Sequence, residues 1–199
     1  MKDLWNSRYN STVYVYGEEP NTYLKAFFDT ANHVGQVLFP GEGEGRNAVY
    51  AAKLGWKVVA FDYSNQGKVK AEMLAKKNGV TIDYLVCDAA EFRSDVAYDV
   101  IAFSFFHIEE LVRKPIFENL FSLLKPGGKV IMEVFSTGNL KYGGIMGPKN
   151  IDLLYSEQSL RNLMQGFHLE HIAVETVTLN EGDFHKGQGE VINLLAIKR

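Results

Sequence analysis

Residues 37–64 read VLFPGEGEGRNAVYAAKLGWKVVAFDYS, and this stretch decides the fold. The apolar run QVLF (36–39) predicts a strand, and Arg46–Leu54 has the pattern of a helix. KVVAFD (57–62) predicts a second strand that ends on an acid. Because glycines allow a backbone to approach a ligand closely, the glycine-rich turn between the first strand and the helix predicts a binding site.

The same alternation continues towards the C-terminus. The pattern predicts a helix over Gln66–Lys77, strands over 81–87 and 98–105, and a helix over Ile116–Leu124 with Pro115 in its first turn. A Pro-Gly-Gly turn at 126–128 precedes a further strand over 129–135. Apolar strands that alternate with helices indicate a parallel sheet with both faces buried.

The C-terminal third has a different pattern. A helix near 156–164 is followed by strand-like runs at 168–179 and 190–199, with only a polar segment between them. No crossover helix fits there, so the two strands should pair antiparallel. His168 and His171 lie three positions apart on the first of them and should face opposite sides. We therefore expect an α/β, doubly wound, mostly parallel seven-stranded sheet with an antiparallel C-terminal strand.

Composition indicates one soluble domain over residues 1–199. Hydrophobic residues make up 46% of the chain, charged residues 23%, and the net charge is −3 with no basic strip, so we expect no nucleic-acid partner. The start of the chain is polar and aromatic rather than signal-like, and no apolar run is long enough for a bilayer. The single cysteine, Cys87, fits a cytoplasmic location. Nothing in the sequence indicates an oligomeric state.

The glycine-rich turn and Asp62 together predict a nucleotide-type ligand. The helix start at Gly45–Asn47 offers N–H groups to a carboxylate or phosphate, and Asp62 stands where an acid binds ribose hydroxyls. The alternative is a plain turn whose glycines serve packing. Residues 43–48 also fit a permissive dinucleotide pattern, but no tyrosine has a lysine four positions later and no P-loop occurs.

The chain resembles the class I S-adenosylmethionine-dependent methyltransferases. The matching pieces, in the family's order, are VLFPGEGEGRNAVYAAKLG, AFDYS, CDAAEF, YDVIAFSFFHI and LLKPGGKVIMEVF. The N-terminal and C-terminal segments resemble the small tellurite-resistance-type bacterial members. Phe39 stands where the family commonly has an acid. The resemblance implies a Rossmann-like fold, S-adenosyl-L-methionine as cofactor and a small-molecule methyl acceptor.

The resemblance also implies roles for individual residues. The glycine loop would pass beneath the methionine part of the cofactor, Asp62 would bind the ribose, and Asp88 would bind the adenine amino group unless it caps a helix. Ser104 and Phe105 would lie near the sulfonium. The cofactor-binding residues that we expect are Gly41, Glu42, Gly43, Gly45, Asn47, Asp62, Tyr63, Ser64, Asp88, Ala89, Ser104 and Phe105.

His107 is the candidate catalytic residue. It follows the fourth strand, where it would act as a general base, orient substrate, or cap a nearby helix. A base is needed only if the acceptor arrives protonated, because alignment can otherwise supply most of the rate. His185 is a weaker candidate for substrate contact. No cluster has metal-ligand spacing, so we expect no metal.

Two segments are candidates to enclose the site. Residues 1–20 would form a lid over the cofactor or, alternatively, a strap that covers apolar surface; their candidate contact residues are Trp5, Arg8, Tyr9 and Tyr14. Lys141–Pro148 would form a second wall through Tyr142 or Met146. Two other functions stay open at this point: a binding protein for the cofactor without turnover, and a nicotinamide-dependent oxidoreductase.

Overall fold

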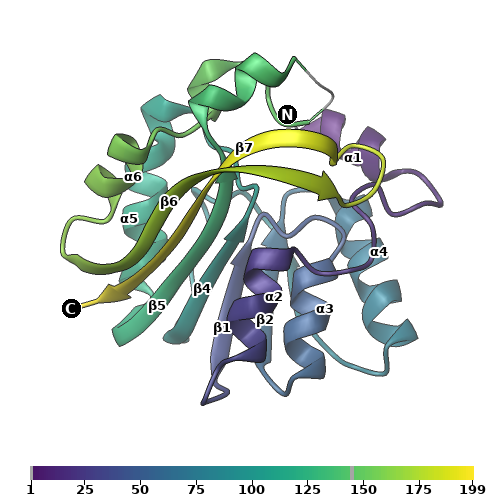
Figure 1. The fold of residues 1–199 in the computed structure, drawn as a ribbon. Helices are drawn as coiled ribbons and strands as arrows, with labels where there is room; N and C mark the ends of the chain where they lie inside the picture. The colour runs from purple at the N-terminus through teal and green to yellow at the C-terminus, as the bar shows by residue number, and fades with distance from the viewer. Residues whose placement is uncertain (1, 144–145) are drawn as a thin grey trace.

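The computed structural model describes residues 2–143 and 146–199. Its centre is a seven-stranded sheet in the order β3-β2-β1-β4-β5-β7-β6 (Figure 1). The strands are β1 Gln36–Pro40, β2 Lys57–Asp62, β3 Asp83–Val86, β4 Tyr98–Ser104, β5 Leu124–Phe135, β6 Phe167–Asn180 and β7 Lys186–Lys198.

Strands β1 to β5 pair in parallel, whereas β7 is antiparallel to both β5 and β6. The predicted fold class is therefore confirmed. The order of strands along the chain reverses direction at β1, which lies between β2 and β4. In open α/β sheets a ligand site lies beyond the carboxyl ends of the strands at such a reversal.

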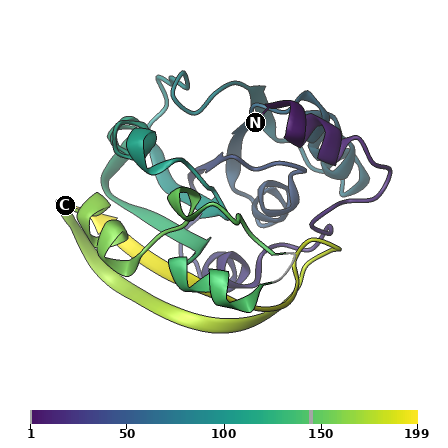
Figure 2. The ribbon, with the colours of Figure 1, turned by 90° about the horizontal axis from the view of Figure 1, so that it is seen from above.

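Helices cover both faces of the sheet (Figures 1 and 2). They are α1 Lys2–Tyr9, α2 Thr22–Asp29, α3 Arg46–Lys53, α4 Asn65–Lys77, α5 Glu110–Ser122 and α6 Glu157–Leu163, with 3-10 turns η1 Thr137–Tyr142 and η2 Ile151–Leu153. The largest core cluster joins α5 and α6 to the sheet through residues such as Phe117 and Leu160, and a second joins α2 and α3 through Phe28 and Ala48. Within the described ranges, every helix is too short or too polar to cross a membrane.

Helix α5 begins six residues earlier than predicted, at Glu110 rather than Ile116, so Pro115 lies inside the helix instead of in its first turn. The apolar pattern did not reveal this first part because Leu111 is 95% exposed and Val112 is 47% exposed. The sequence analysis also missed α2. Its signal is the N-cap Asn21, whose side chain accepts from the Leu24 N–H, with Leu24 and Phe28 buried four positions apart.

The Pro-Gly-Gly turn and the two histidines of β6 also differ from expectation. The turn residues fall within β5, where the pairing with β4 shifts register between Tyr98 and Val100. In β6 a shift between Leu169 and His171 inserts one residue. Because this bulge reverses the alternation, His168 and His171 are both exposed, whereas the two were expected on opposite faces.

Candidate functional site

The carboxyl ends of β2, β1 and β4 bring three predicted site positions together. Gly41 follows the end of β1, Asp62 is the last residue of β2, and Ser104 is the last residue of β4. These strands are neighbours in the sheet, so the three positions lie at one edge.

Asp62 joins the glycine loop to the loop that follows β2. Its two carboxylate oxygens accept from the Gly43 N–H at 3.2 Å and from the Ser64 N–H at 2.8 Å. The side chain is buried, and burial raises its pKa to about 6. Since a carboxylate has about four lone-pair positions, Asp62 keeps acceptor capacity for a ribose diol. The acid therefore fits the ligand that its position predicts.

The glycine loop has a backbone that only glycine adopts readily. Gly41, Gly43 and Gly45 have φ values of 64°, 62° and 89°. A Cβ at Gly43 would lie 2.6 Å from the Tyr9 hydroxyl oxygen, and one at Gly41 would collide with the Phe106 ring. Tyr9 of α1 and Phe106, which follows β4, therefore pack directly on the backbone of the glycine loop.

A carboxylate of the protein itself, that of Glu42, binds the N–H groups at the start of α3. The buried carboxylate of Glu42 accepts from the Asn47 N–H at 2.8 Å and the Ala48 N–H at 2.7 Å. Burial raises the pKa of Glu42 to about 7. The expectation that this helix start offers free N–H groups to a ligand is therefore wrong for Asn47. Its side chain is also engaged, by Glu42 and by the Asn21 N–H, and its predicted cofactor contact stays a prediction.

Arg46 connects three distant segments through buried polar contacts. Its guanidinium lies 2.7 Å from the Glu181 carboxylate, and both side chains are no more than 10% exposed. The same guanidinium donates to the carbonyls of Tyr16 and Glu19. Arg46 therefore ties the glycine loop to the N-terminal segment and to the tip of the β6–β7 hairpin.

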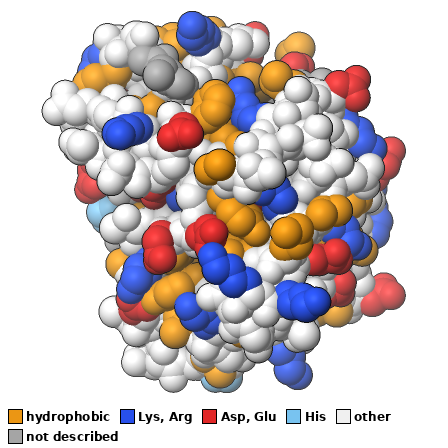
Figure 3. Space-filling model, turned by 90° about the vertical axis from the view of Figure 1, so that its right-hand side faces the viewer, with side chains coloured by type: hydrophobic (Ala, Val, Ile, Leu, Met, Phe, Trp, Pro, Cys, Tyr) orange, Lys and Arg blue, Asp and Glu red, His pale blue; other side chains and the backbone are white. Residues whose placement is uncertain are grey.

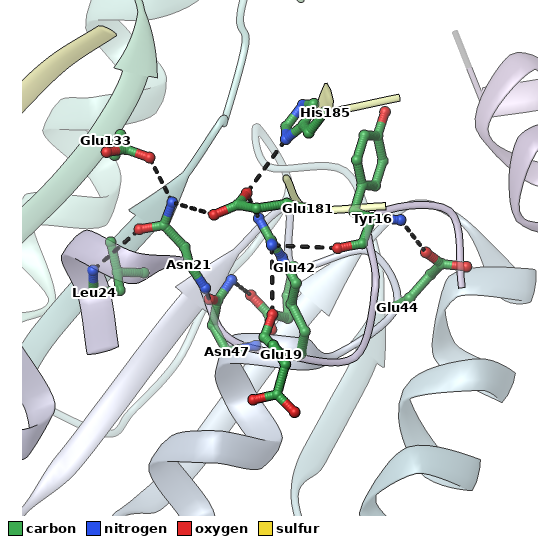
Figure 4. A network of polar contacts seen from close by, with 11 residues as sticks. Tyr16, Glu19, Asn21, Leu24, Glu42, Glu44, Asn47, Glu133, Glu181 and His185 are labelled. Atoms are coloured by element: carbon green, nitrogen blue, oxygen red, sulfur yellow. Dashed lines mark hydrogen bonds and ion pairs between the residues drawn. The ribbon is translucent and has the colours of Figure 1, made fainter. Parts of the chain in front are cut away.

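Asn21 extends this network to the centre of the sheet. Its side-chain amide donates to Glu133 of β5 at 2.5 Å and to Glu181 at 3.4 Å (Figure 4). Glu133 is only 4% exposed, and burial raises its pKa to about 7. The sequence analysis missed both residues, which lie 112 positions apart.

Glu44 holds the next part of the N-terminal segment. Its carboxylate accepts from the Val15 N–H at 2.8 Å and the Tyr16 N–H at 3.4 Å. Lys70 of α4 forms a buried ion pair with Glu44 and donates to the Val13 carbonyl at 2.6 Å. Residues 13–16 are consequently fixed against the glycine loop and α4.

The predicted contact residues of α1 gather above the end of β2. Tyr9 is buried against Gly43, and Arg8 donates to the Tyr16 hydroxyl at 2.9 Å while its guanidinium lies 4.7 Å from the Trp5 ring. Ser64 contacts the Asn6 side chain at 2.8 Å. Tyr14 instead faces α4 and donates to the Lys70 carbonyl.

The backbone is strained at the end of β4. Phe105 has φ 52°, the one left-handed value among the described residues other than glycine. The hydroxyl of Ser104 is buried, with no partner in the described part of the chain. Strained conformations of this kind cluster at functional sites, so both features mark the strand end at which the sulfonium was predicted.

His107 presents one unpaired nitrogen. Its Nδ1 lies 2.8 Å from the Leu153 carbonyl oxygen, which only accepts, so Nδ1 carries the proton and Nε2 is the acceptor. Nε2 is buried and has no partner within residues 2–143 and 146–199. Burial lowers the pKa of His107 to about 4, so the ring is neutral at neutral pH. The ring stacks on Phe135 with centroids 5.8 Å apart.

His185 reaches the same aromatic cluster from the β6–β7 hairpin. Its ring lies 4.3 Å from Phe105, 5.4 Å from Phe135 and 4.5 Å from Tyr16, measured between centroids. Its Nδ1 is 3.5 Å from Glu181, and burial lowers its pKa. His107 and His185 therefore both contact Phe135.

The remaining predicted site residues lie outside the network of contacts described above. Asp88 is exposed and its side chain accepts from the Ala90 N–H at 2.9 Å, which makes a turn rather than a helix cap. Ala89 beside it is buried. The Tyr142 hydroxyl lies 3.0 Å from that of Thr176 in β6. Part of the predicted second wall, residues 144–145, lies outside the described residues.

Comparison with known proteins finds methyltransferases. Residues 37–128 match a family described as a methyltransferase domain. Over 109 residues the chain is 29% identical to tRNA 5-carboxymethoxyuridine methyltransferase of Escherichia coli K12, covering 53% of this chain and 42% of that protein. It is 30% identical to ubiquinone biosynthesis O-methyltransferase of Rickettsia felis, covering 54% and 44%. The match spans less than half the length of both relatives.

Solved structures share the whole fold at low identity. A structure from echinomycin biosynthesis has a TM-score of 0.82 at 18% identity, covering 100% of this chain and 92% of the other. The N-methyltransferase NodS of Bradyrhizobium japonicum with S-adenosyl-L-homocysteine has 0.77 at 12%, covering 99% and 97%. TehB of Haemophilus influenzae has 0.74 at 17%, covering 100% and 67%.

Breaking the Arg46–Glu181 pair should destabilise the fold far more than breaking a surface pair of equal N–O distance. Arg46→Met leaves the buried Glu181 carboxylate without its cation and should lower the free energy of unfolding by about 3–5 kcal/mol. Arg161 and Glu157 are also 2.7 Å apart but more than 40% exposed, so Arg161→Met should cost less than about 1 kcal/mol. Urea unfolding followed by circular dichroism measures both, and equal losses would contradict the network.

Glu133 should make stability depend on pH. Its pKa is about 7 when folded and 4.5 ordinarily, so its contribution is complete below pH 4.5 and is lost as pH rises through about 7. Glu133→Gln keeps an acceptor for Asn21 and should gain about 3 kcal/mol over wild type at pH 8, with no gain at pH 4. Urea titrations at several pH values measure the free energy of unfolding of both proteins. A difference between Glu133→Gln and wild type that does not change with pH would refute this account. So would the same pH dependence in the exposed control Glu118→Gln.

Proposed function

We propose that this chain, a class I S-adenosylmethionine-dependent methyltransferase, methylates a small molecule by direct transfer from the sulfonium. The observation that carries the proposal is the edge formed by the ends of β1, β2 and β4. There a buried acid and the glycine loop meet a buried hydroxyl that has no partner among the described residues. We propose residues 1–199 as one cytoplasmic domain with 1–20 as its lid.

The proposed cofactor contacts follow from the groups that the protein leaves available. Asp62 has acceptor capacity for the ribose hydroxyls, and exposed Asp88 would accept from the adenine amino group. The hydroxyl of Ser104 lacks a partner among the described residues and would lie near the sulfonium. Gly41–Gly45 and Tyr63 would supply backbone and ring contacts. S-adenosylmethionine supplies an electrophilic methyl group that needs no covalent enzyme intermediate.

The N-terminal segment would exclude water from the site. Tyr9 rests on Gly43, Trp5 packs 5.4 Å from Tyr9, and Glu44 and Arg46 fix residues 15–19 below. Desolvation strengthens electrostatic interactions and prevents loss of the reactive group to water. Since Tyr9 covers the loop that would hold the cofactor, α1 must shift when the cofactor enters.

The acceptor would bind next to Phe105, Phe135 and the two histidines. His107 offers the neutral Nε2 as a base for a protonated acceptor, and His185 would position the acceptor. An aromatic, buried site of this kind suits a small acceptor. The relatives named for tRNA and ubiquinone substrates make a nucleic acid the alternative.

Surface charge favours the small acceptor over RNA. The net charge is −3. On the face that carries α4, Lys and Arg side chains alternate with acidic and apolar ones (Figure 3), and Val69 and Met73 of α4 are 49% and 61% exposed. RNA binding usually depends on a continuous basic patch.

A screen for methylated product tests the proposal. The protein is incubated with methyl-labelled S-adenosylmethionine and a panel of thiols, amines, hydroxyl compounds, selenium and tellurium oxyanions, and bulk tRNA. Label should transfer to a small acceptor. Transfer only to tRNA would overturn the acceptor class, and cofactor binding without any product would favour a binding protein.

Asp62→Asn should weaken cofactor binding. The variant keeps the side-chain shape and one acceptor but loses the charge that strengthens hydrogen bonds to the ribose, so affinity should fall about ten-fold. Exposed Asp83→Asn on β3 is the matched control and should bind as wild type. Calorimetric titration with S-adenosylhomocysteine measures both. Unchanged affinity in a folded Asp62→Asn variant would place the ribose elsewhere.

His107→Asn should distinguish base catalysis from alignment. The new side chain retains a donor for the Leu153 carbonyl but has no basic nitrogen, so kcat should fall by about 10²–10⁴ if the acceptor must lose a proton. Wild-type activity should then fall as pH drops through about 4, where the imidazole becomes protonated. Full kcat in the variant would leave alignment alone to explain the rate.

A further inference from the structure

Arg113 of α5 is a buried arginine that binds backbone carbonyls instead of an acid. It is 4% exposed, and none of the ion pairs among the described residues includes it. Its guanidinium donates to the carbonyls of Ile108 at 2.9 Å, Asp152 at 2.8 Å and Leu154 at 3.0 Å. Because desolvation of a charge is costly, these charge-assisted hydrogen bonds must offset the burial of the guanidinium.

The three carbonyls flank the hydrogen bond between His107 and Leu153. His107 Nδ1 lies 2.8 Å from the Leu153 carbonyl oxygen. Leu153 lies between the two residues at the end of η2 whose carbonyls bind Arg113, and His107 directly precedes the third, Ile108. Arg113 therefore holds the backbone on both sides of this hydrogen bond.

Tyr155 completes the support from below. Its hydroxyl donates to the Phe106 carbonyl at 2.8 Å, so the residue before His107 is also held. The Tyr155 ring is fully buried and its centroid lies 3.9 Å from the Arg113 guanidinium carbon, which is the geometry of a cation–π contact. The loop after β4 is consequently fixed by Tyr155 before His107 and by Arg113 after it.

This support determines which ring nitrogen of His107 carries the proton. In a neutral imidazole one nitrogen donates and the other accepts, and the hydrogen bond of one nitrogen sets the role of the other. The Leu153 carbonyl only accepts, so it selects the Nδ1–H tautomer. Burial is the main cause that lowers the pKa of His107, and the charges of His185 and Arg113 act in the same direction.

We propose that Arg113 is a positioning residue that keeps the His107 proton on Nδ1 and leaves Nε2 as the basic nitrogen, by holding the carbonyls on both sides of the His107–Leu153 hydrogen bond. The use of Nε2 as a base rests on the proposed function. The position of the proton does not, so it can be measured on the full chain without cofactor or acceptor.

Two-bond ¹H–¹⁵N correlation spectra at neutral pH show which ring nitrogen is protonated. The chain has five histidines, and His107→Asn identifies the signals of His107. Wild type should have the Nδ1–H pattern. In Arg113→Gln the ratio of the tautomers should shift about three- to ten-fold towards Nε2–H, which is the range that the net strength of a neutral hydrogen bond gives.

Two further variants separate positioning from a general loss of structure. Arg113→Lys keeps the charge but loses the planar fork, so it should shift the ratio about two- to three-fold, and it carries the test if Arg113→Gln does not fold. Exposed Arg93 also donates to backbone carbonyls, those of Ala90 and Phe92, so Arg93→Gln is the matched control and should have the wild-type ratio. Circular dichroism checks the fold of each variant.

The proposal is overturned if wild-type His107 carries its proton on Nε2, if the folded Arg113 variants keep the wild-type ratio, or if Arg93→Gln shifts it equally. These outcomes differ from failure of the proposed base. Full kcat in His107→Asn would remove His107 from the chemistry without changing its tautomer in the wild-type protein.

Discussion

The buried ion pair of Arg46 and Glu181 is the contact on which the carboxyl end of the sheet depends. One guanidinium binds a carboxylate from the β6–β7 hairpin and two carbonyls from the N-terminal segment. Separating the pair would leave a charge in a place without water, which costs far more than breaking a surface pair. This constraint fixes how three segments, far apart in sequence, meet above the glycine loop.

The same region contains several carboxyl groups whose burial opposes ionisation. The pKa values of Glu42, Asp62 and Glu133 are all raised, to about 7, 6 and 7. Backbone N–H groups partly offset the cost of desolvation at Glu42 and Asp62, and the Asn21 amide does so at Glu133. Such groups cluster where proteins bind and transform ligands. The strained Phe105 lies at the same end, as does His107, whose Nε2 has no partner in the described part of the chain; both agree with the proposed site.

The sequence predicts most helices and strands of the α/β fold correctly. Helices α3 and α4 have an apolar period and clear ends, and the strands of the parallel sheet are short apolar runs between turns. The first turn of α5 has outward apolar residues, so periodicity does not reveal it. Asn21, Glu133 and Glu181 gain their roles only from contacts between distant segments. The bulge in β6 likewise depends on its pairing with β7.

The glycine loop shows both the strength and the limit of reading local sequence. Its positive-φ glycines are visible as a motif, and the structure gives them that backbone. The motif does not reveal that Glu42 accepts from the N–H groups at the start of α3. Glu42 therefore competes with any ligand for these N–H groups. Because the loop caps its own helix, the proposed site relies on side chains such as Asp62 and Ser104 rather than on the N–H groups that Glu42 occupies.

Calorimetric titration of the full chain with S-adenosylmethionine, S-adenosylhomocysteine and NAD under one condition tests the central claim most directly. The glycine loop, the acid at the end of β2 and the buried hydroxyl at the end of β4 suit an adenosine joined to an amino-acid tail. We expect the two sulfur compounds to bind with one-to-one stoichiometry and NAD to bind much more weakly. Tighter binding of NAD would contradict the account.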